Sequence, residues 1–155
     1  MQATAEPSVF VEREIFIAAR PETVWELLAD ARQMIRWMGL TAVLDPHPGG
    51  TYRVEVIPGH VASGEIVEID APRRLVHTWG WEQGDSVVPP GSSTVIWELV
   101  PREDGTLLRL THRDLPSAAA AASHTHGWEH YLGRLTQLGA GADPGPDPWI
   151  TGDRV

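Results

Sequence analysis

The sequence predicts a single α+β domain in which an antiparallel sheet wraps a long C-terminal helix around an apolar pocket. Three observations support this prediction. Short runs of alternating apolar and polar residues, bounded by Gly, Pro or Asp, fill the middle of the chain. Stretches with helical spacing of apolar residues flank these runs on both sides. The length of 155 residues suits one domain with a hydrophobic core of its own.

The first expected elements are a strand and two short helices. Val9 to Ile17 alternates apolar and polar residues, which is typical of a strand, and residues 1–8 before it are expected to form a flexible leader. Pro21 suits the first turn of a helix. A second short helix is expected over Ala31 to Met38. The first helix has an apolar stripe at helical spacing, made by Val24, Trp25, Leu27 and Leu28.

Six further strands are expected, because turn-forming clusters separate runs rich in β-branched and aromatic residues. Short hairpin connections make the sheet antiparallel, and one of its faces must be covered. The connection from Glu82 to Ser93 is longer than a hairpin requires, so it is either a lid or an ordinary surface loop. The expected strands are Leu40 to Leu44, Thr51 to Ile57, Val61 to Ile69, Leu75 to Trp81, Thr94 to Val100 and Thr106 to Arg113.

The longest predicted helix follows the last strand and is the obvious cover for the sheet. Ser117 is suited to cap its start, and Gly139 and Gly141 to end it. The domain is therefore expected to span residues 9–139. The Pro/Gly-rich residues 140–155 are expected to form a mobile tail. The apolar stripe of the helix comprises Ala121, His124, Trp128, Leu132, Leu135 and Leu138.

Composition excludes several classes of function. A formal net charge of −9 argues against nucleic-acid binding, which depends on Lys and Arg neutralising phosphates. The absence of Cys excludes disulfides, thiolate nucleophiles and zinc-thiolate sites. No apolar run is long enough to span a bilayer, and the N-terminal sequence does not resemble a secretion signal. A cytoplasmic location is expected.

The seven Trp residues indicate a cavity wall or a contact surface, because Trp is large and carries an N–H that needs a partner. Strand alternation places the aromatic and His side chains of the expected strands on one face, which we assign inward. Either these residues line a ligand pocket or they fill the core, and a one-residue register error would turn a strand face outward. The candidate ligand-binding residues are Trp37, Tyr52, Val54, His77, Trp79, Trp81, Trp97, Leu110, His112, His124 and Trp128.

Histidines are the candidates for chemistry. His77 and His112 would act as acid or base if the protein is an enzyme, and the alternative is that each is a hydrogen-bonded structural residue. His126 and His130 share one helical face, but no third ligand converges with them. No metal or other cofactor is expected. No sequence motif of a catalytic nucleophile is present.

An ordered series of short motifs runs from the first helix to the long one. These motifs are Arg20 to Trp25, Trp37, Pro48 to Tyr52, Gly64 to Ile69, Pro72 to Trp79, Gly105 to His112, and Gly127 with Trp128. Together they resemble the activator of heat-shock-protein-ninety ATPase (Aha-type) homologues of the START-like, or SRPBCC, superfamily. The resemblance implies a helix-grip fold, in which members often hold a hydrophobic ligand between sheet and helix. The eukaryotic co-chaperone engages its chaperone with an additional N-terminal domain, for which we expect no room here.

Three functions remain open. The leading hypothesis is non-catalytic binding or carriage of a small hydrophobic molecule, lipid-like or aromatic, in the cavity between sheet and helix. The second is an enzyme of the polyketide cyclase or aromatase type, as the resemblance to START-like proteins implies. The third is a protein-interaction module in a stress response, with a chaperone as partner. The sequence also leaves a homodimer open.

Overall fold

Seven strands form one antiparallel sheet in the computed structural model, which describes residues 9–84 and 86–152. The expected leader, residues 1–8, lies outside the described residues. The sheet order is β1-β7-β6-β5-β4-β3-β2, so that the first two strands of the chain form the two edges. The strands are β1 Val9–Ile17, β2 Thr41–Leu44, β3 Thr51–Ile57, β4 His60–Asp70, β5 Arg74–Trp79, β6 Ser93–Arg102 and β7 Gly105–Leu115.

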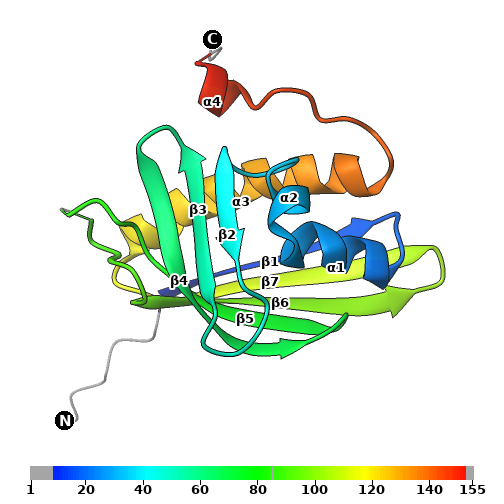
Figure 1. Ribbon diagram of the computed structural model, residues 1–155, viewed down its shortest axis with the longest axis horizontal. Helices are drawn as coiled ribbons and strands as arrows, with labels where there is room; N and C mark the ends of the chain where they lie inside the picture. Colours follow the sequence, from blue (N-terminus) through cyan, green and yellow to red (C-terminus); the bar gives the residue numbers. More distant parts are fainter. Residues whose placement is uncertain (1–8, 85, 153–155) are drawn as a thin grey trace.

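Four helices accompany the sheet within the described residues: α1 Pro21–Ala29, α2 Ala31–Met34, α3 Ala118–Gly139 and α4 Pro148–Thr151. The sheet bends so that β2 to β4 stand up from the other strands, and α3 lies in the bend (Figure 1). The two short helices α1 and α2 close one end. This is the expected helix-grip arrangement, and the prediction of fold class is confirmed.

Local signals placed most elements correctly. Strands β1 and β3 have the predicted bounds, and the Ser117 side chain caps α3 by accepting a hydrogen bond from the Ala120 N–H. Strand β5 ends at Trp79, two residues before its predicted end. Trp81 still forms an isolated bridge to Ala62 of β4, but its backbone N–H donates to the Val88 carbonyl in the loop from β5 to β6 at 2.7 Å. Helix α2 ends at Met34, four residues before its predicted end at Met38, and residues 35–37 form a turn.

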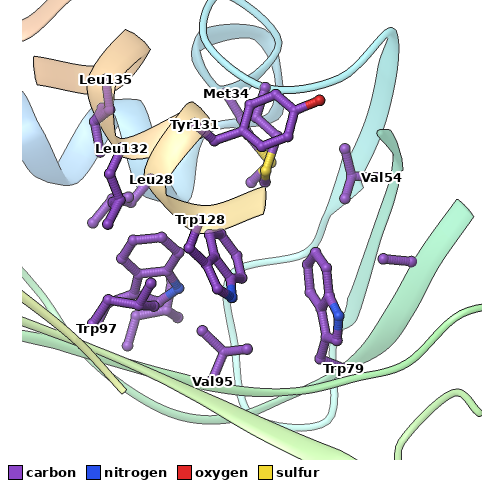
Figure 2. Close-up of a cluster of buried hydrophobic side chains, with 14 of the residues drawn as sticks. Leu28, Met34, Val54, Trp79, Val95, Trp97, Trp128, Tyr131, Leu132 and Leu135 are labelled. Carbon is purple, nitrogen blue, oxygen red and sulfur yellow. The ribbon is translucent and has the colours of Figure 1, made fainter. Parts of the chain in front are cut away.

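The core lies between α3 and the concave face of the sheet. Trp97 of β6 and Trp128 of α3 meet edge to face, with ring centroids 5.5 Å apart. Val95 of β6 lies below these two rings, and Leu132 and Leu135 of α3 lie above them (Figure 2). The inward assignment of the strand faces is confirmed, since every predicted inward residue of β3, β6 and β7 is buried. Packing this dense is the main stabilising term of the fold.

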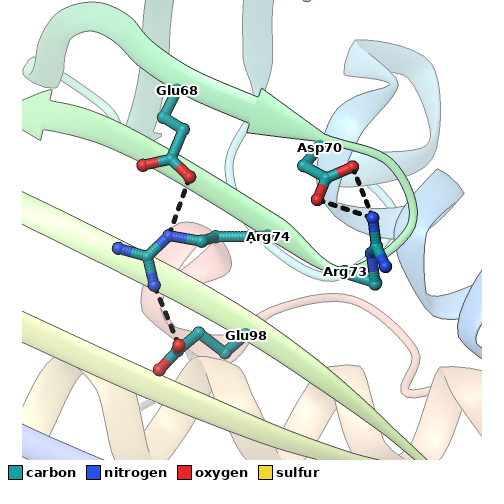
Figure 3. A network of polar contacts seen from close by, with 5 residues as sticks. All are labelled: Glu68, Asp70, Arg73, Arg74 and Glu98. Carbon is teal, nitrogen blue, oxygen red and sulfur yellow. Dashed lines mark hydrogen bonds and ion pairs between the residues drawn. The ribbon is translucent and has the colours of Figure 1, made fainter.

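The outer face of the sheet carries charge instead. Arg74 of β5 bonds Glu68 of β4 at 3.0 Å and Glu98 of β6 at 2.8 Å, and Arg73 pairs with Asp70 beside them (Figure 3). These side chains are about a third or more exposed, so each pair contributes about 0–1 kcal/mol. Their role is to keep this face of the sheet in water.

The segment for which a mobile tail is expected is described as far as residue 152. After α3 the chain turns back above the helix and forms α4 there (Figure 1). Trp149 of α4 stacks on His130 of α3, with ring centroids 3.8 Å apart and an interplanar angle of 10°. Asp147 is only 6% exposed. A Pro/Gly-rich composition predicts mobility, but here one Trp and one Asp dock the segment on α3.

Candidate functional site

A cavity of about 460 Å³ opens between the first half of α3 and the ends of β3, β4 and β5. This volume suits a small organic molecule. Among the described residues, none of the side chains in its wall belongs to Asp, Glu, Lys or Arg. The wall is therefore aromatic and aliphatic, with a few neutral polar groups. It consists of Met38, Val56, Ile57, His60, Trp79, Trp81, Gln83, Ser86, Ser123, His124, His126, Gly127, Trp128, Tyr131 and Trp149.

Four of the predicted site residues border this cavity: Trp79, Trp81, His124 and Trp128. The other seven are buried in the core away from its wall, namely Trp37, Tyr52, Val54, His77, Trp97, Leu110 and His112. The difference arises because these seven residues pack within the core between the sheet and the helices, whereas the cavity lies beside the first half of α3.

Sequence reasoning missed two aromatic residues of the wall. Tyr131 follows Trp128 by three positions on α3, so helical spacing was a signal that could have found it. Trp149 lies in a Pro/Gly-rich segment without periodicity, and no local signal pointed to it. The predicted long loop contributes Gln83 and Ser86 to the cavity, while its Val88 is anchored in the core with 1% exposure.

His77 is fully buried on β5, and both of its ring nitrogens are used. The Trp97 indole N–H donates to Nε2 at 3.1 Å, and Nδ1 donates to the Thr78 carbonyl at 3.0 Å. The ring also stacks on Tyr52, with centroids 3.6 Å apart. Burial lowers the pKa of His77 to about 4. The imidazole is therefore neutral, with its proton on Nδ1.

His112 of β7 has the opposite tautomer. The Trp128 indole N–H donates to Nδ1 at 3.0 Å, so that the proton is on Nε2 and points at Ser93 Oγ, 2.8 Å away. The Ser93 hydroxyl in turn donates a hydrogen bond to the Trp79 carbonyl at 2.7 Å. Burial, with a smaller contribution from His124 and His77, lowers the pKa of His112 to about 2. This imidazole is also neutral.

His124 repeats the arrangement at the cavity wall. The Trp81 indole N–H donates to Nε2 at 3.1 Å, and Nδ1 donates to the Ala120 carbonyl one turn back along α3 at 2.8 Å. Burial lowers the pKa of His124. The three imidazoles thus each accept from an indole and donate to an oxygen. None has a free nitrogen for proton transfer, and none is paired with a carboxylate in the described structure.

Two polar groups beside the cavity are left without partners. Trp79 Nε1 and Tyr131 Oη are buried, and neither has a hydrogen-bond partner among the described residues. Burial, followed by the nearby Asp147 carboxylate, raises the pKa of Tyr131, so the phenol stays neutral. An unpaired buried group costs about 1–3 kcal/mol. A water or an oxygen of a ligand near either group would recover part of that cost.

The helical His pair has other partners. His130 Nε2 lies 2.8 Å from Asp147 Oδ1, and His126 lies against the Trp149 ring, 5.1 Å between centroids. In the described part of the chain no three His, Asp or Glu side chains are placed to hold a metal ion. No described helix has both the length and the apolar character needed to cross a membrane.

A bent antiparallel sheet that grips a C-terminal helix over an apolar cavity defines a START-like helix-grip protein. The family model of Activator of Hsp90 ATPase homolog 1-like protein matches residues 18–140. The chain belongs to this family, and the resemblance seen in its motifs is confirmed. No curated protein sequence matches the chain.

Solved structures extend the likeness. The AHSA1-like protein from Rhizobium etli is 46% identical, with 97% of this chain and 93% of that chain covered and a TM-score of 0.75. CalU16 from Micromonospora echinospora is 27% identical, covering 93% of this chain and 79% of that one, with a TM-score of 0.69. An HSP90 activator from Plasmodium falciparum is 25% identical, covering 83% and 92%, with a TM-score of 0.66.

Proposed function

We propose that the protein binds and carries a small, uncharged hydrophobic molecule in the cavity between α3 and the sheet, without converting it chemically. The observation that carries this proposal is the wall itself: an aromatic cavity of about 460 Å³ with no charged side chain among its described residues. Sites for small apolar ligands are built in this way. A cytoplasmic location remains part of the proposal.

An aromatic ligand suits the wall better than a fatty acid does. Trp79 and Trp81 border the cavity from the end of β5, and Trp128 and Tyr131 border it from α3, so rings are available on both sides for stacking. The carboxylate of a fatty acid would need a cation or several donors, because an unpaired charge is costly to bury. The described wall has no Lys or Arg to pair with it.

The hydrogen bonds of the histidines weigh against the cyclase or aromatase alternative. A general acid or base must reach the proton that it transfers. His77 and His112 are fully buried outside the cavity wall, and each is held by a Trp on one nitrogen and an oxygen on the other. Proton transfer would first require breaking one of these bonds.

A chaperone partner is the second candidate. It is favoured by the description of the matching family and by the similarity to the HSP90 activator from Plasmodium falciparum. Stimulation of the ATPase of a purified HSP90 by this protein would support it. Unchanged ATPase turnover at saturating protein, together with no complex by gel filtration, would reject it.

Titration with two fluorescent probes tests the binding function. Prodan is a neutral naphthyl ketone, and dansyl-undecanoic acid is a fatty-acid analogue; both emit at shorter wavelength when bound in an apolar site. We expect saturable, equimolar binding of prodan with a Kd of about 10 μM or below, and binding of the fatty-acid analogue at least about tenfold weaker.

A matched pair of glycine variants locates the site. Gly127 borders the cavity, and a Cβ there meets open space, so Gly127→Leu should fill the cavity and weaken prodan binding about tenfold or more. Gly133→Leu on the same helix is the control, because Gly133 is exposed and away from the cavity. No saturable binding, or equal affinity in the two variants, would reject the proposed site.

A further inference from the structure

The last described residues of the chain supply one wall of the cavity. We propose that residues 143–152, here called the C-terminal strap, act as a gate that opens for the ligand and closes over it with Trp149. This proposal rests on the proposed binding function. Trp149 is the one strap residue in the described cavity wall. The match to the family model ends at residue 140, before the strap begins.

A buried carboxylate holds the tip of the strap. Asp147 Oδ1 lies 2.8 Å from His130 Nε2 of α3 and also accepts the Trp149 backbone N–H at 2.9 Å. The same side chain therefore caps α4 and ties it to α3. Because Asp147 is 6% exposed, solvent screens this contact little.

Trp149 is placed by rings of α3. Its ring stacks on His130 at 3.8 Å and meets the Tyr131 ring edge to face, with centroids 5.6 Å apart. His126 lies 5.1 Å away at a tilt of 31°. His126 lies one turn before His130 and Tyr131 on α3, and His126 and Tyr131 themselves border the cavity. Trp149 thus continues the aromatic wall from the helix onto the strap.

Arg134 clamps the base of the strap. Its Nη2 donates to the Gly145 carbonyl at 2.9 Å and its Nη1 to the Pro144 carbonyl at 3.4 Å, while Nε donates to the Trp37 carbonyl in the core at 3.1 Å. Gly145 has a φ of 72°, which glycine adopts without strain. Arg134 therefore holds the base of the strap to α3, and in the proposed gate the tip moves while this base stays in place.

The docking of the tip has the features of a weak contact. No residue of α4 is fully buried, and within α4 only Trp149 packs against the core, so the docked tip rests on few side chains. Two buried atoms at this contact, Asp147 Oδ2 and Tyr131 Oη, have no hydrogen bond of good geometry among the described residues, although the Asp147 carboxylate lies close enough to raise the pKa of Tyr131. A poorly paired buried group contributes less to docking than a well-paired one. Segments with few buried contacts open at low free energy, as a gate requires.

Binding kinetics of prodan test the gate. Trp149→Ala removes the gating ring, and we expect both the association and the dissociation rate to rise by about fivefold or more, with a smaller change in Kd. Ile150→Ala on the same short helix is the control, because Ile150 does not border the cavity. Unchanged rates in Trp149→Ala, or a rise of the dissociation rate alone, would overturn the gate.

The tie to α3 can be tested without any ligand. Asp147→Ala should raise amide hydrogen exchange over residues 146–152 by about tenfold or more, whereas Asp147→Asn keeps the accepting oxygen and should stay close to wild type. Equal exchange in all three proteins would overturn the proposed role of Asp147 in holding the strap to α3.

The ligand titrations separate the failure of the gate from the failure of the binding function. If prodan and the fatty-acid analogue both fail to bind, both proposals are rejected. If prodan binds with wild-type rates in Trp149→Ala, only the gate falls.

Discussion

Three tryptophan indoles donate to three histidine imidazoles in and beside the core: Trp97 to His77, Trp128 to His112 and Trp81 to His124. Each pair satisfies a donor and an acceptor at once; the first two pairs are buried and the third is partly buried, and an unmet buried group of either kind is costly. Each pair also selects one neutral tautomer. The placement of these three histidines is therefore explained by the tryptophans around them.

Removing one indole donor should lower the stability of the fold. Trp97→Phe leaves His77 Nε2 without a partner and a small void at the centre of the core, so we expect a loss of about 2–4 kcal/mol in the free energy of unfolding. Urea unfolding followed by Trp fluorescence measures it. Trp25→Phe on α1 is the control, since Trp25 is only partly buried, and should cost about 1 kcal/mol or less. Equal losses in the two variants would contradict the assigned role of the Trp97 N–H.

At the scale of elements, backbone contact decides how β4 meets β5. Gly64 on β4 lies so close to Thr78 on β5 that a Cβ would overlap the Thr78 carbonyl. The Thr78 hydroxyl also accepts the Glu65 backbone N–H at 2.9 Å. A glycine within a strand permits this close approach, at the cost of the packing that a side chain would add.

Two alanine substitutions of glycine should therefore have opposite signs. Gly64→Ala must separate β4 from β5, and we expect it to destabilise the protein by about 2 kcal/mol or more. Gly133→Ala meets open space on the exposed face of α3 and should stabilise by about 0.5–1 kcal/mol, because alanine favours the helix. Thermal unfolding of both variants against wild type checks this pair. A Gly64→Ala variant as stable as wild type would show that β4 and β5 are less closely packed than described.

At the scale of the whole molecule, the buried histidines make stability depend on pH. In the unfolded chain these imidazoles ionise near the ordinary histidine pKa of 6.5, whereas in the folded protein the pKa is about 4 for His77 and about 2 for His112. The unfolded state therefore binds more protons than the folded state below pH 6.5, and stability falls as the pH falls toward 4. Well above pH 6.5 these imidazoles are neutral in both the folded and the unfolded state, so the full stability is present and no longer changes with their titration.

Acid titration of stability checks the prediction. The free energy of unfolding should fall by about 1–3 kcal/mol for each pH unit below about pH 6, since two groups contribute up to about 1.4 kcal/mol each. Urea midpoints measured at several pH values would show it. His60→Gln should leave the slope close to that of wild type, because His60 lies on the surface. A midpoint that stays constant from neutral pH to about pH 5 would contradict the buried neutral imidazoles.

Much of the fold could be predicted, but less of the site. The inward faces of Trp97 and Leu110 follow from strand alternation, which is local and survives small errors at strand ends. Whether an inward residue borders the cavity depends on where α3 lies. The position of α3 leaves His77 in the core and puts His124 at the cavity wall. No pattern in one strand contains that information.

Local patterns in the chain are enough to establish the order of strands and helices, the gripping role of α3 and the inward aromatic residues, because hydrophobic periodicity and capping act between near neighbours. Which indole meets which imidazole, where space remains and how the strap docks are settled by folding alone. Trp81 and His124 are 43 positions apart, and His130 and Asp147 are 17 apart. Such contacts exist only once the sheet has closed around the helix, so the chemistry of the cavity is a property of the folded chain.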